Sequence, residues 1–389
     1  MFVAQLVVMT GFSFVQPFIP LYIQELGSLN VNGAAFWSGL AISGTGIGMV
    51  ISSPFWGLLA DRIGRKPMVL RAMLGGAVII GLQGLAPNVY VFVILRIIQG
   101  LFSGTVAAAS ALVTSSSPRD KTGYAMGLLM LALYVGTAIG PSIGGFTAHV
   151  FGYRLPFYIT GGLIFIGGIL VQFLVKETFQ PPVQKASFRS MWQLAGAKTF
   201  LPLLLTSAVI SLAFQTSQPI VALYMAQLGS TDSAAMLSGF AFALMGVITA
   251  LSSVISGRLI SRINPKKVLI VACIGTGLLY LLPIFAANTT QLIVFIGLLG
   301  LLQGSAITSS TSMIGMSVLI VQQGIAYGLS QSANSIGFSL GPIIGGSAAQ
   351  IVNLRYIFGI STFFYLIIGL FAAKYVGSRA PQEVRQTAE

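Results

Sequence analysis

A series of apolar stretches, each about 20 residues long, fills nearly the whole of this chain and limits its fold more than any other feature. A helix of about 20 apolar residues crosses the roughly 30 Å hydrocarbon core of a bilayer. Charged residues make up only 7% of the sequence, against about 25% in an ordinary soluble domain. The sequence therefore predicts an all-α membrane protein. We expect twelve transmembrane helices, at about residues 3–26, 36–60, 67–86, 89–112, 123–148, 155–175, 198–226, 236–259, 267–286, 289–313, 323–348 and 355–376.

Basic residues are divided unevenly between the predicted loops. All of the 20 Lys and Arg lie on one side of the predicted membrane except Arg154 and Arg355 on the other side and Arg96 inside a helix. The positive-inside rule then places both termini and the central loop in the cytoplasm. We interpret the net charge of +13 as a signal for the orientation of the chain in the membrane. Anionic lipid headgroups would supply the counter-charge. We therefore expect no nucleic-acid partner. The chain begins almost inside the first helix, without a basic leader or clear cleavage site, so we expect no removable signal peptide.

The chain contains a duplication, because two segments about 200 residues apart carry nearly the same residues. The offset is 202 residues before the first loop and 200 after it. In a membrane protein, such a repeat is typical of a transporter with its site between the halves. We expect two six-helix halves at residues 1–176 and 198–376, a cytoplasmic linker at 177–197 and a cytoplasmic tail at 377–389. The shared positions are Tyr22, Leu26, Gly27, Ser28, Ser38, Gly39, Gly57, Arg62 and Lys66 in one copy and Tyr224, Leu228, Gly229, Ser230, Ser238, Gly239, Gly257, Arg262 and Lys266 in the other.

A short loop after the second predicted helix carries one acid among several cations. Asp61 lies four residues after Gly57, and Gly64 supplies a tight turn before Arg65. An acid at this place can pair with arginine or cap the positive N-terminus of a neighbouring helix. The alternative on charge alone is a positive-inside loop with one neutralising aspartate.

The full spacing of that loop resembles the signature G-x-L-a-D-R-x-G-R-[KR] of the major facilitator superfamily. The segments Leu95–Gly100 and Gly136–Gly145 are similar to its R-x-x-Q-G pattern and to the G-x3-G-P-x2-G-G signature of its exporters. Phe12, Pro17, Pro20 and Tyr22 resemble the P-x-x-P pattern of its twelve-span drug:proton antiporters. The chain thus resembles the bacterial multidrug-efflux branch.

This resemblance implies the major facilitator fold and a set of activities. We expect a secondary-active exporter of amphipathic drugs or similar small molecules, which works by alternating access and proton-coupled antiport. The resemblance further implies a monomer in the bacterial cytoplasmic membrane, in contact with membrane lipids, with no cofactor and no metal. The residues expected to serve coupling or gating are Glu25, Asp61, Arg62, Arg65, Arg96, Gln99, Gly136, Gly140, Pro141 and Gly144.

Arg96 lies about seven residues into its predicted helix. An arginine this deep costs free energy unless it faces water or finds partners, so it marks a pathway by default. The alternative is that its side chain extends back to the membrane interface. The resemblance implies a role in proton coupling or in organising the cavity, with Gln99 one turn below as a hydrogen-bond partner.

Neutral polar and aromatic residues on the corresponding helices of the two halves form a candidate cavity. Amides with Met and aromatic side chains make an adaptable, mostly apolar pocket. The alternative for each residue is a hydrogen bond or contact between helices. The predicted cavity residues are Phe12, Gln16, Met130, Tyr134, Phe214, Gln215, Gln218, Gln303, Gln331 and Asn334.

The two copies differ where charge occurs. None of the seven acids lies at the centre of a predicted helix, so the residue that carries a proton is not identified, and Glu25 is either a candidate or a solvated helix-end charge. Ser261 stands where Asp61 would repeat, and Asn264 replaces Gly64. We expect Gly300 to be the counterpart of Arg96 and Gln303 that of Gln99, which leaves the charged chemistry to the first half.

Other functions fit the sequence less well. The nearest alternative is an exporter of the same fold with a narrow substrate such as a sugar, an amino acid or a lipid. A membrane enzyme needs a nucleophile with a base or a metal cluster, and a chain with one histidine (His149) and one cysteine (Cys273) offers neither. ATP drive is disfavoured because no G-x4-G-K-[ST] loop occurs. Paired bent helices fit a transporter that works by alternating access better than they fit a channel.

Overall fold

The computed structural model describes residues 1–116, 122–177, 196–197, 200–229, 232–260, 262–318 and 323–377. Within these ranges, the side chains of Asp61 and Met130 are among those outside the description. The described residues form helices and connections without a strand. Nine helical segments of this part of the chain are long and apolar enough to cross a membrane. The all-helical membrane fold is thereby confirmed, while the count of twelve spans stays a prediction.

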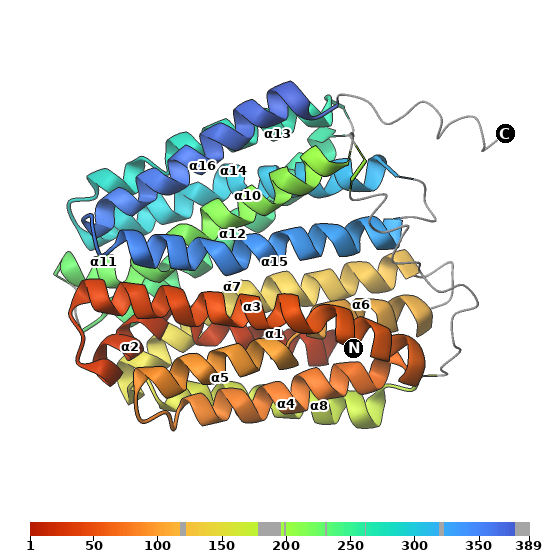
Figure 1. Cartoon of the computed structure of the whole chain (residues 1–389), viewed down its shortest axis with the longest axis horizontal. Coiled ribbons are helices and arrows are strands. Elements are labelled where there is room, and N and C mark those ends of the chain that lie inside the picture. Colours follow the sequence, from red (N-terminus) through yellow and green to blue (C-terminus); the bar gives the residue numbers. More distant parts are fainter. Residues whose placement is uncertain are drawn as a thin grey trace.

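The helices form two groups that follow the order of the chain (Figure 1). The first group, called the first half below, consists of α1 (Phe2–Phe14), η1 (Gln16–Phe18), α2 (Ile19–Gly27), α3 (Val31–Ile63), α4 (Arg65–Gln83), α5 (Val89–Phe102), α6 (Thr105–Ser116), α7 (Thr122–Phe151) and α8 (Leu155–Leu174). The second half consists of α10 (Leu201–Ser217), η2 (Gln218–Ile220), α11 (Val221–Gln227), α12 (Ala234–Ile260), α13 (Pro265–Leu279), η3 (Leu282–Phe285), α14 (Thr289–Met316), α15 (Gln323–Ala348) and α16 (Leu354–Tyr375).

Each half begins with a helix that is interrupted at the same place. Pro17 lies in the 3₁₀ turn η1 between α1 and α2, and Pro219 lies in η2 between α10 and α11. Proline lacks the N–H that would continue the hydrogen-bond ladder of an α-helix, so a tighter turn takes its place. The duplication therefore repeats the bend as well as the residues.

The predicted helix at 89–112 is broken in the structure, which the sequence did not indicate. The helix α5 ends at Phe102, and Gly104 follows with a backbone φ of 112°. The guanidinium of Arg71 donates to the carbonyl oxygens of Leu101 (3.3 Å) and Ser103 (3.2 Å) and stacks 3.8 Å over the ring of Trp56. These contacts satisfy carbonyls that the break releases. In the second half, α14 continues without a break.

The register of the repeat in this region differs from our expectation. The side-chain oxygen of Asn88 caps α5 by accepting from the N–H of Val91. In the same way, the side-chain oxygen of Asn288 caps α14 by accepting from the N–H of Gln291. An offset of 200 residues therefore relates α5 to α14, and Gly75 against Phe102 repeats as Gly275 against Leu302. The pairing of Arg96 with Gly300 and of Gln99 with Gln303 was wrong. Their counterparts are Ile296 and Leu299, both apolar and buried.

The halves meet along two seams that the repeat relates, α7 with α12 and α3 with α15 (Figure 1). In the first seam, a Cβ atom on Gly239 would collide with the carbonyl oxygen of Pro141. In the second, Gly39 lies equally close to the carbonyl oxygen of Pro342. Glycine is required at both places because only a residue without a side chain allows this approach.

Further contacts between the halves lie at the end of the molecule that carries the α2–α3, α7–α8 and α11–α12 connections, called the closed end below. His149 Nδ1 donates to the carbonyl oxygen of Asp232 (2.6 Å), and Gln350 Nε2 donates to that of Asn32 (2.5 Å). The helix α16, which begins near the closed end, ends at the opposite end of the molecule (Figure 1). The halves are therefore joined at one end of the helices.

Candidate functional site

Arg96 is buried in the first half with 1% of its surface exposed, so it does not extend to the interface. Its Nη1 atom donates to Gln99 Oε1 at 3.1 Å, and Gln83 Nε2 donates to the same oxygen at 2.9 Å. Among the described residues, Arg96 Nε and Nη2 have no hydrogen-bond partner. The predicted partnership of Arg96 with Gln99 agrees with this geometry, and Gln83 is a member that sequence reasoning missed.

Aromatic side chains cover this cluster. The Arg96 guanidinium lies 5.5 Å from the centre of the Phe92 ring. Phe92 and Phe157 both pack against Tyr22, whose hydroxyl donates to the carbonyl oxygen of Gln83 (3.1 Å). A cation in such a dry setting interacts strongly with any charge that reaches it. The arrangement can hold a positive charge inside the first half and respond to protonation nearby.

A pocket of about 220 Å³ lies in the second half, between α10, α14 and α15. Phe214, Gln303, Gln331 and Asn334, four of the predicted cavity residues, line it. Sequence reasoning missed the other lining residues, which are Ser207, Ile210, Ser211, Ile307, Ser310 and Thr311. Small hydroxyl residues gave no signal because a serine in a helix can bond to its own backbone and is compatible with almost any environment.

The other predicted cavity residues do not line this pocket. Phe12 and Gln16 are half-buried in α1 and at the start of η1, and Gln218 has the same position at the start of η2. Gln215 is buried, with its Cβ 2.8 Å from where a side chain on Gly341 would begin. Tyr134 is exposed on α7. Met130 lies in α7, and its side chain is outside the described residues.

The glycines of the segment 136–145 pack α7 against α1 of the same half. Gly136 lies against Met9 and Thr10, Gly140 against Ser13, and Gly144 against the Phe14 backbone. The segment 337–346 repeats this packing against α10. Each of these segments therefore joins its own half through three glycines and the other half through its proline and last glycine.

The carboxylate of Glu177 caps α4. Glu177 accepts from the backbone N–H of Arg65 (2.9 Å) and of Lys66 (2.8 Å). Gly64, with a φ of 103°, makes the predicted turn but has no side chain to cap with. In the second half, Asn264 caps its helix itself through Lys266 N (3.0 Å). Asp61 lies in the last turn of α3, with its side chain outside the described residues.

The remaining predicted gating residues lie at the ends of helices. Arg62 is exposed and Arg65 half-buried beside the start of α4. Glu25 is exposed near the end of α2, at the closed end. Burial, together with the negative charges of Glu25 and Asp232, raises the pKa of Tyr153 in the α7–α8 connection. Tyr153 therefore lies close enough to one acid from each half for both charges to act on it.

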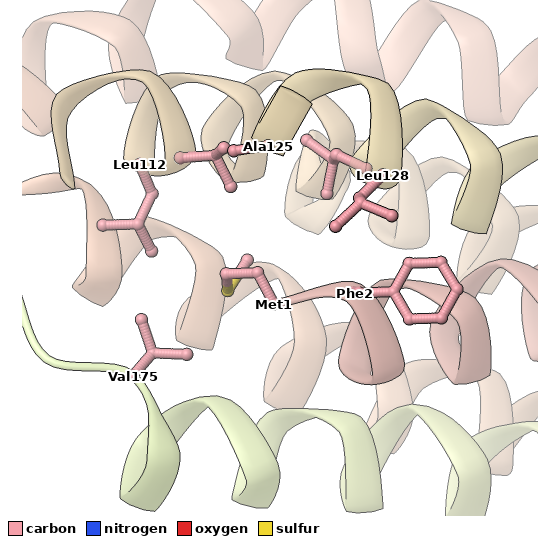
Figure 2. A pocket seen from close by; sticks show the side chains of 8 residues that line it. Met1, Phe2, Leu112, Ala125, Leu128 and Val175 are labelled. Carbon is pink, nitrogen blue, oxygen red and sulfur yellow. The ribbon is translucent and has the colours of Figure 1, made fainter. Parts of the chain in front are cut away.

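A second pocket, of about 240 Å³, lies in the first half where α1 begins. Figure 2 shows Met1, Phe2, Leu112, Ala125, Leu128 and Val175 around it. Its lining is apolar and contains no group that would orient a ligand. We assign it no part in recognition.

These features together define a multi-pass membrane transporter: two related helix groups, seams at one end and a polar pocket at the middle of the helices. The sequence matches the Major Facilitator Superfamily over residues 1–250 and 203–389, and the chain belongs to this superfamily.

Curated relatives resemble the chain over most of its length. It is 36% identical to the multidrug resistance protein MdtG of Klebsiella pneumoniae (strain 342) over 352 residues, which cover 90% of this chain and 85% of that protein. It is 35% identical to the multi-drug resistance efflux pump PmrA of Streptococcus pneumoniae (strain ATCC BAA-334 / TIGR4), over 91% of this chain and 88% of that one.

Solved structures share the fold at low identity. A bacterial homologue of the human lysosomal transporter Spinster, in an inward-facing and unoccupied conformation, superposes with a TM-score of 0.78 at 15% identity, over 98% of this chain and 97% of that one. The D-xylose–proton symporter superposes with a TM-score of 0.75 at 14% identity, over 97% and 96%. The superfamily match and the curated relatives identify the chain as a transporter and not an enzyme.

Proposed function

We propose that this chain is a secondary-active exporter of amphipathic drugs or similar small molecules, driven by proton entry. The observation that carries the proposal is the pair of repeat-related seams, which in the described part of the chain join the halves at the closed end. Export is supported by relatives named as multidrug efflux proteins across nine tenths of the chain. A two-fold repeat with bent helices and a site near mid-membrane suits rocking of one half against the other.

The proposed moving bodies are residues 1–176 and 198–376, joined by a cytoplasmic linker at 177–197 and followed by a cytoplasmic tail. The excess of Lys and Arg in the loops at the opposite end from the seams supports a cytoplasmic position for both termini in the bacterial inner membrane. With this orientation, the closed end faces outward and the structure represents an inward-facing state. We propose that the protein works as a monomer surrounded by lipid.

We propose that substrate binds between the halves, in contact with Phe214, Gln303, Gln331 and Asn334 and with Phe12 and Gln16 on the facing half. Arg96 and Gln99 serve proton coupling. Asp61, Arg62 and Arg65 act as gating residues at the cytoplasmic end and Glu25 at the outer end. Pro141 lies on the surface along which the halves move, and Gly136, Gly140 and Gly144 hold α7 against α1 within the moving first half.

Dye accumulation in cells tests this function. Cells that express the protein are loaded with Nile red, an uncharged amphipathic dye, and its extrusion is followed with and without an uncoupler. We expect extrusion that stops when the proton gradient collapses. Equal dye levels in expressing and non-expressing cells would contradict export, and extrusion that persists with uncoupler would contradict proton coupling.

A further inference from the structure

The pocket in the second half contains buried hydrogen-bond acceptors that the protein leaves free. Gln303, at the middle of α14, is 3% exposed, and Ser310, two turns further on, is 2% exposed. Gln303 Oε1 and Ser310 Oγ find no hydrogen-bond partner among the described residues. Buried polar atoms of this kind are rare in proteins and call for a partner. Both residues line the same pocket.

The neighbouring polar groups are already engaged with one another. Ser207 Oγ donates to Asn334 Oδ1 at 2.7 Å, and Ser211 Oγ donates to the carbonyl oxygen of Asn334 at 2.9 Å. These bonds fix α10 against α15 and hold that wall of the pocket in place. Gln303 and Ser310, on the facing helix α14, are the buried acceptors of the pocket that have no partner among the described residues.

The pocket offers no counter-charge to a cation. No acidic residue is among the described residues that line it. The acids with described side chains, Glu25, Glu177 and Asp232, lie beside helix ends. Burying an unpaired positive charge within the membrane is costly, whereas a neutral donor needs only a hydrogen-bond acceptor. The site thus favours an uncharged group.

The repeat shows that two polar positions of this pocket are specific to the second half. Gly136 packs against Met9 in the first half, and its counterpart Gly337 packs against Ser211 in the second. In the same register, Leu133 stands where the second half has Asn334. The counterparts of Ser207, Gln303 and Ser310 are also polar, namely Gln5, Ser103 and Ser110.

We propose that the pocket between α10, α14 and α15 binds an uncharged hydrogen-bond donor of the substrate, a hydroxyl or an amide N–H, through Gln303 Oε1 and Ser310 Oγ. This inference rests on the proposed function, because it specifies which group of an amphipathic substrate the second half recognises.

Direct binding to the purified full chain tests this assignment. One probe is chloramphenicol, a neutral molecule with two hydroxyls and an amide N–H, and its diacetate is the matched compound without hydroxyl donors. Tetraphenylphosphonium is a cation without any donor. The variants are Gln303→Leu and Ser310→Ala. Ser309→Ala is the control, because Ser309 is equally buried on the same helix, its Oγ also lacks a partner among the described residues, and it does not line the pocket.

We expect Gln303→Leu and Ser310→Ala each to weaken chloramphenicol binding about 3- to 10-fold, the loss of one hydrogen bond. Binding of tetraphenylphosphonium should not change, Ser309→Ala should match the wild type, and the diacetate should bind the wild type weakly. Equal effects of Ser309→Ala and Ser310→Ala, equal losses for both probes, or no binding of chloramphenicol by the wild type would overturn the assignment. Selective binding without uncoupler-sensitive extrusion of the uncharged dye would instead contradict the proposed function and leave the assignment in place. Gel filtration of each variant confirms that it is folded.

Discussion

At the scale of single residues, Arg96 is a buried cation whose described partners are neutral. Its guanidinium shares Gln99 Oε1 with Gln83. We expect Arg96→Ala to abolish uncoupler-sensitive efflux, since the charge that responds to the proton is gone. Removing this unpaired charge relieves its desolvation cost but leaves a cavity, and the two effects have opposite signs, so the melting temperature should change by only about 2–4 °C. Efflux from inverted vesicles and thermal unfolding in detergent measure the two effects.

A second variant at this position separates charge from geometry, and an arginine elsewhere serves as the control. Arg96→Lys keeps the positive charge but lacks the planar fork that reaches Gln99, so coupled efflux should fall here as well. Arg154→Ala removes an exposed arginine from a loop and should leave efflux intact. Proton-driven efflux at the wild-type rate in Arg96→Ala would rule out the coupling role.

Sequence patterns identified Arg96 with Gln99 because a charge within a hydrophobic stretch stands out. They found Phe214, Gln303, Gln331 and Asn334 because large polar or aromatic side chains are unusual at mid-helix. Ser207, Ser211 and Ser310 were missed because a serine hydroxyl is equally suited to packing and to binding. Only the packing of α10 against α14 and α15 shows that they share a pocket.

At the scale of secondary-structure elements, Glu177 fastens the segment after α8 to the start of α4. Its carboxylate accepts from two backbone N–H groups at the positive end of that helix. We expect Glu177→Ala to destabilise the protein by about 1–2 kcal/mol, because the cap is lost. Glu177→Gln keeps an acceptor and should cost less. Thermal unfolding in detergent is the measurement, with Lys176→Ala, an exposed neighbour, as the control. Equal melting temperatures for Glu177→Ala and the control would contradict the cap.

The break between α5 and α6 depends on Gly104, whose φ of 112° is unfavourable for any residue with a side chain. We expect Gly104→Ala to destabilise the protein by about 1 kcal/mol or more. Gly76 is the matched glycine, because it lies inside α4 and a Cβ there meets nothing within 4 Å. Gly76→Ala should be neutral or stabilising by up to about 1 kcal/mol. The melting temperatures of the two variants are compared in the same detergent. Equal destabilisation by Gly104→Ala and Gly76→Ala would contradict the requirement for glycine at the break.

The order of the helices was readable from hydropathy, but their interruptions were not. Gly104 resembles the many other glycines of the chain until its φ is known. The register of the repeat was also misjudged, because Gln303-Gly304 repeats the pair Gln99-Gly100 four residues away from the true position. The helix caps Asn88 and Asn288 establish the offset, and such caps are readable from sequence when sought.

At the scale of the whole molecule, the two seams set the balance between the states of the transporter. Gly39 and Gly239 allow the backbones of the two halves to touch at the closed end. A methyl group at either place would overlap a carbonyl oxygen of the other half, and overpacking of this kind costs about 1–3 kcal/mol. That cost falls only on the state in which the seams are closed. The population should therefore shift about 5- to 150-fold toward the state in which this end is open.

A cysteine reporter at the closed end detects this shift. The native Cys273 is fully buried, so a second cysteine at Asn32, which bonds to Gln350 across the seam, can be labelled selectively with a membrane-impermeant maleimide in intact cells. We expect Gly39→Ala and Gly239→Ala to raise the labelling rate of Asn32→Cys and to slow efflux. Gly246→Ala is the matched control, because a Cβ there lies an ordinary 3.5 Å from Ala138 of the other half. If all three variants label at the rate of the parent, the seams do not control access, and the rocking of the two halves must be limited elsewhere.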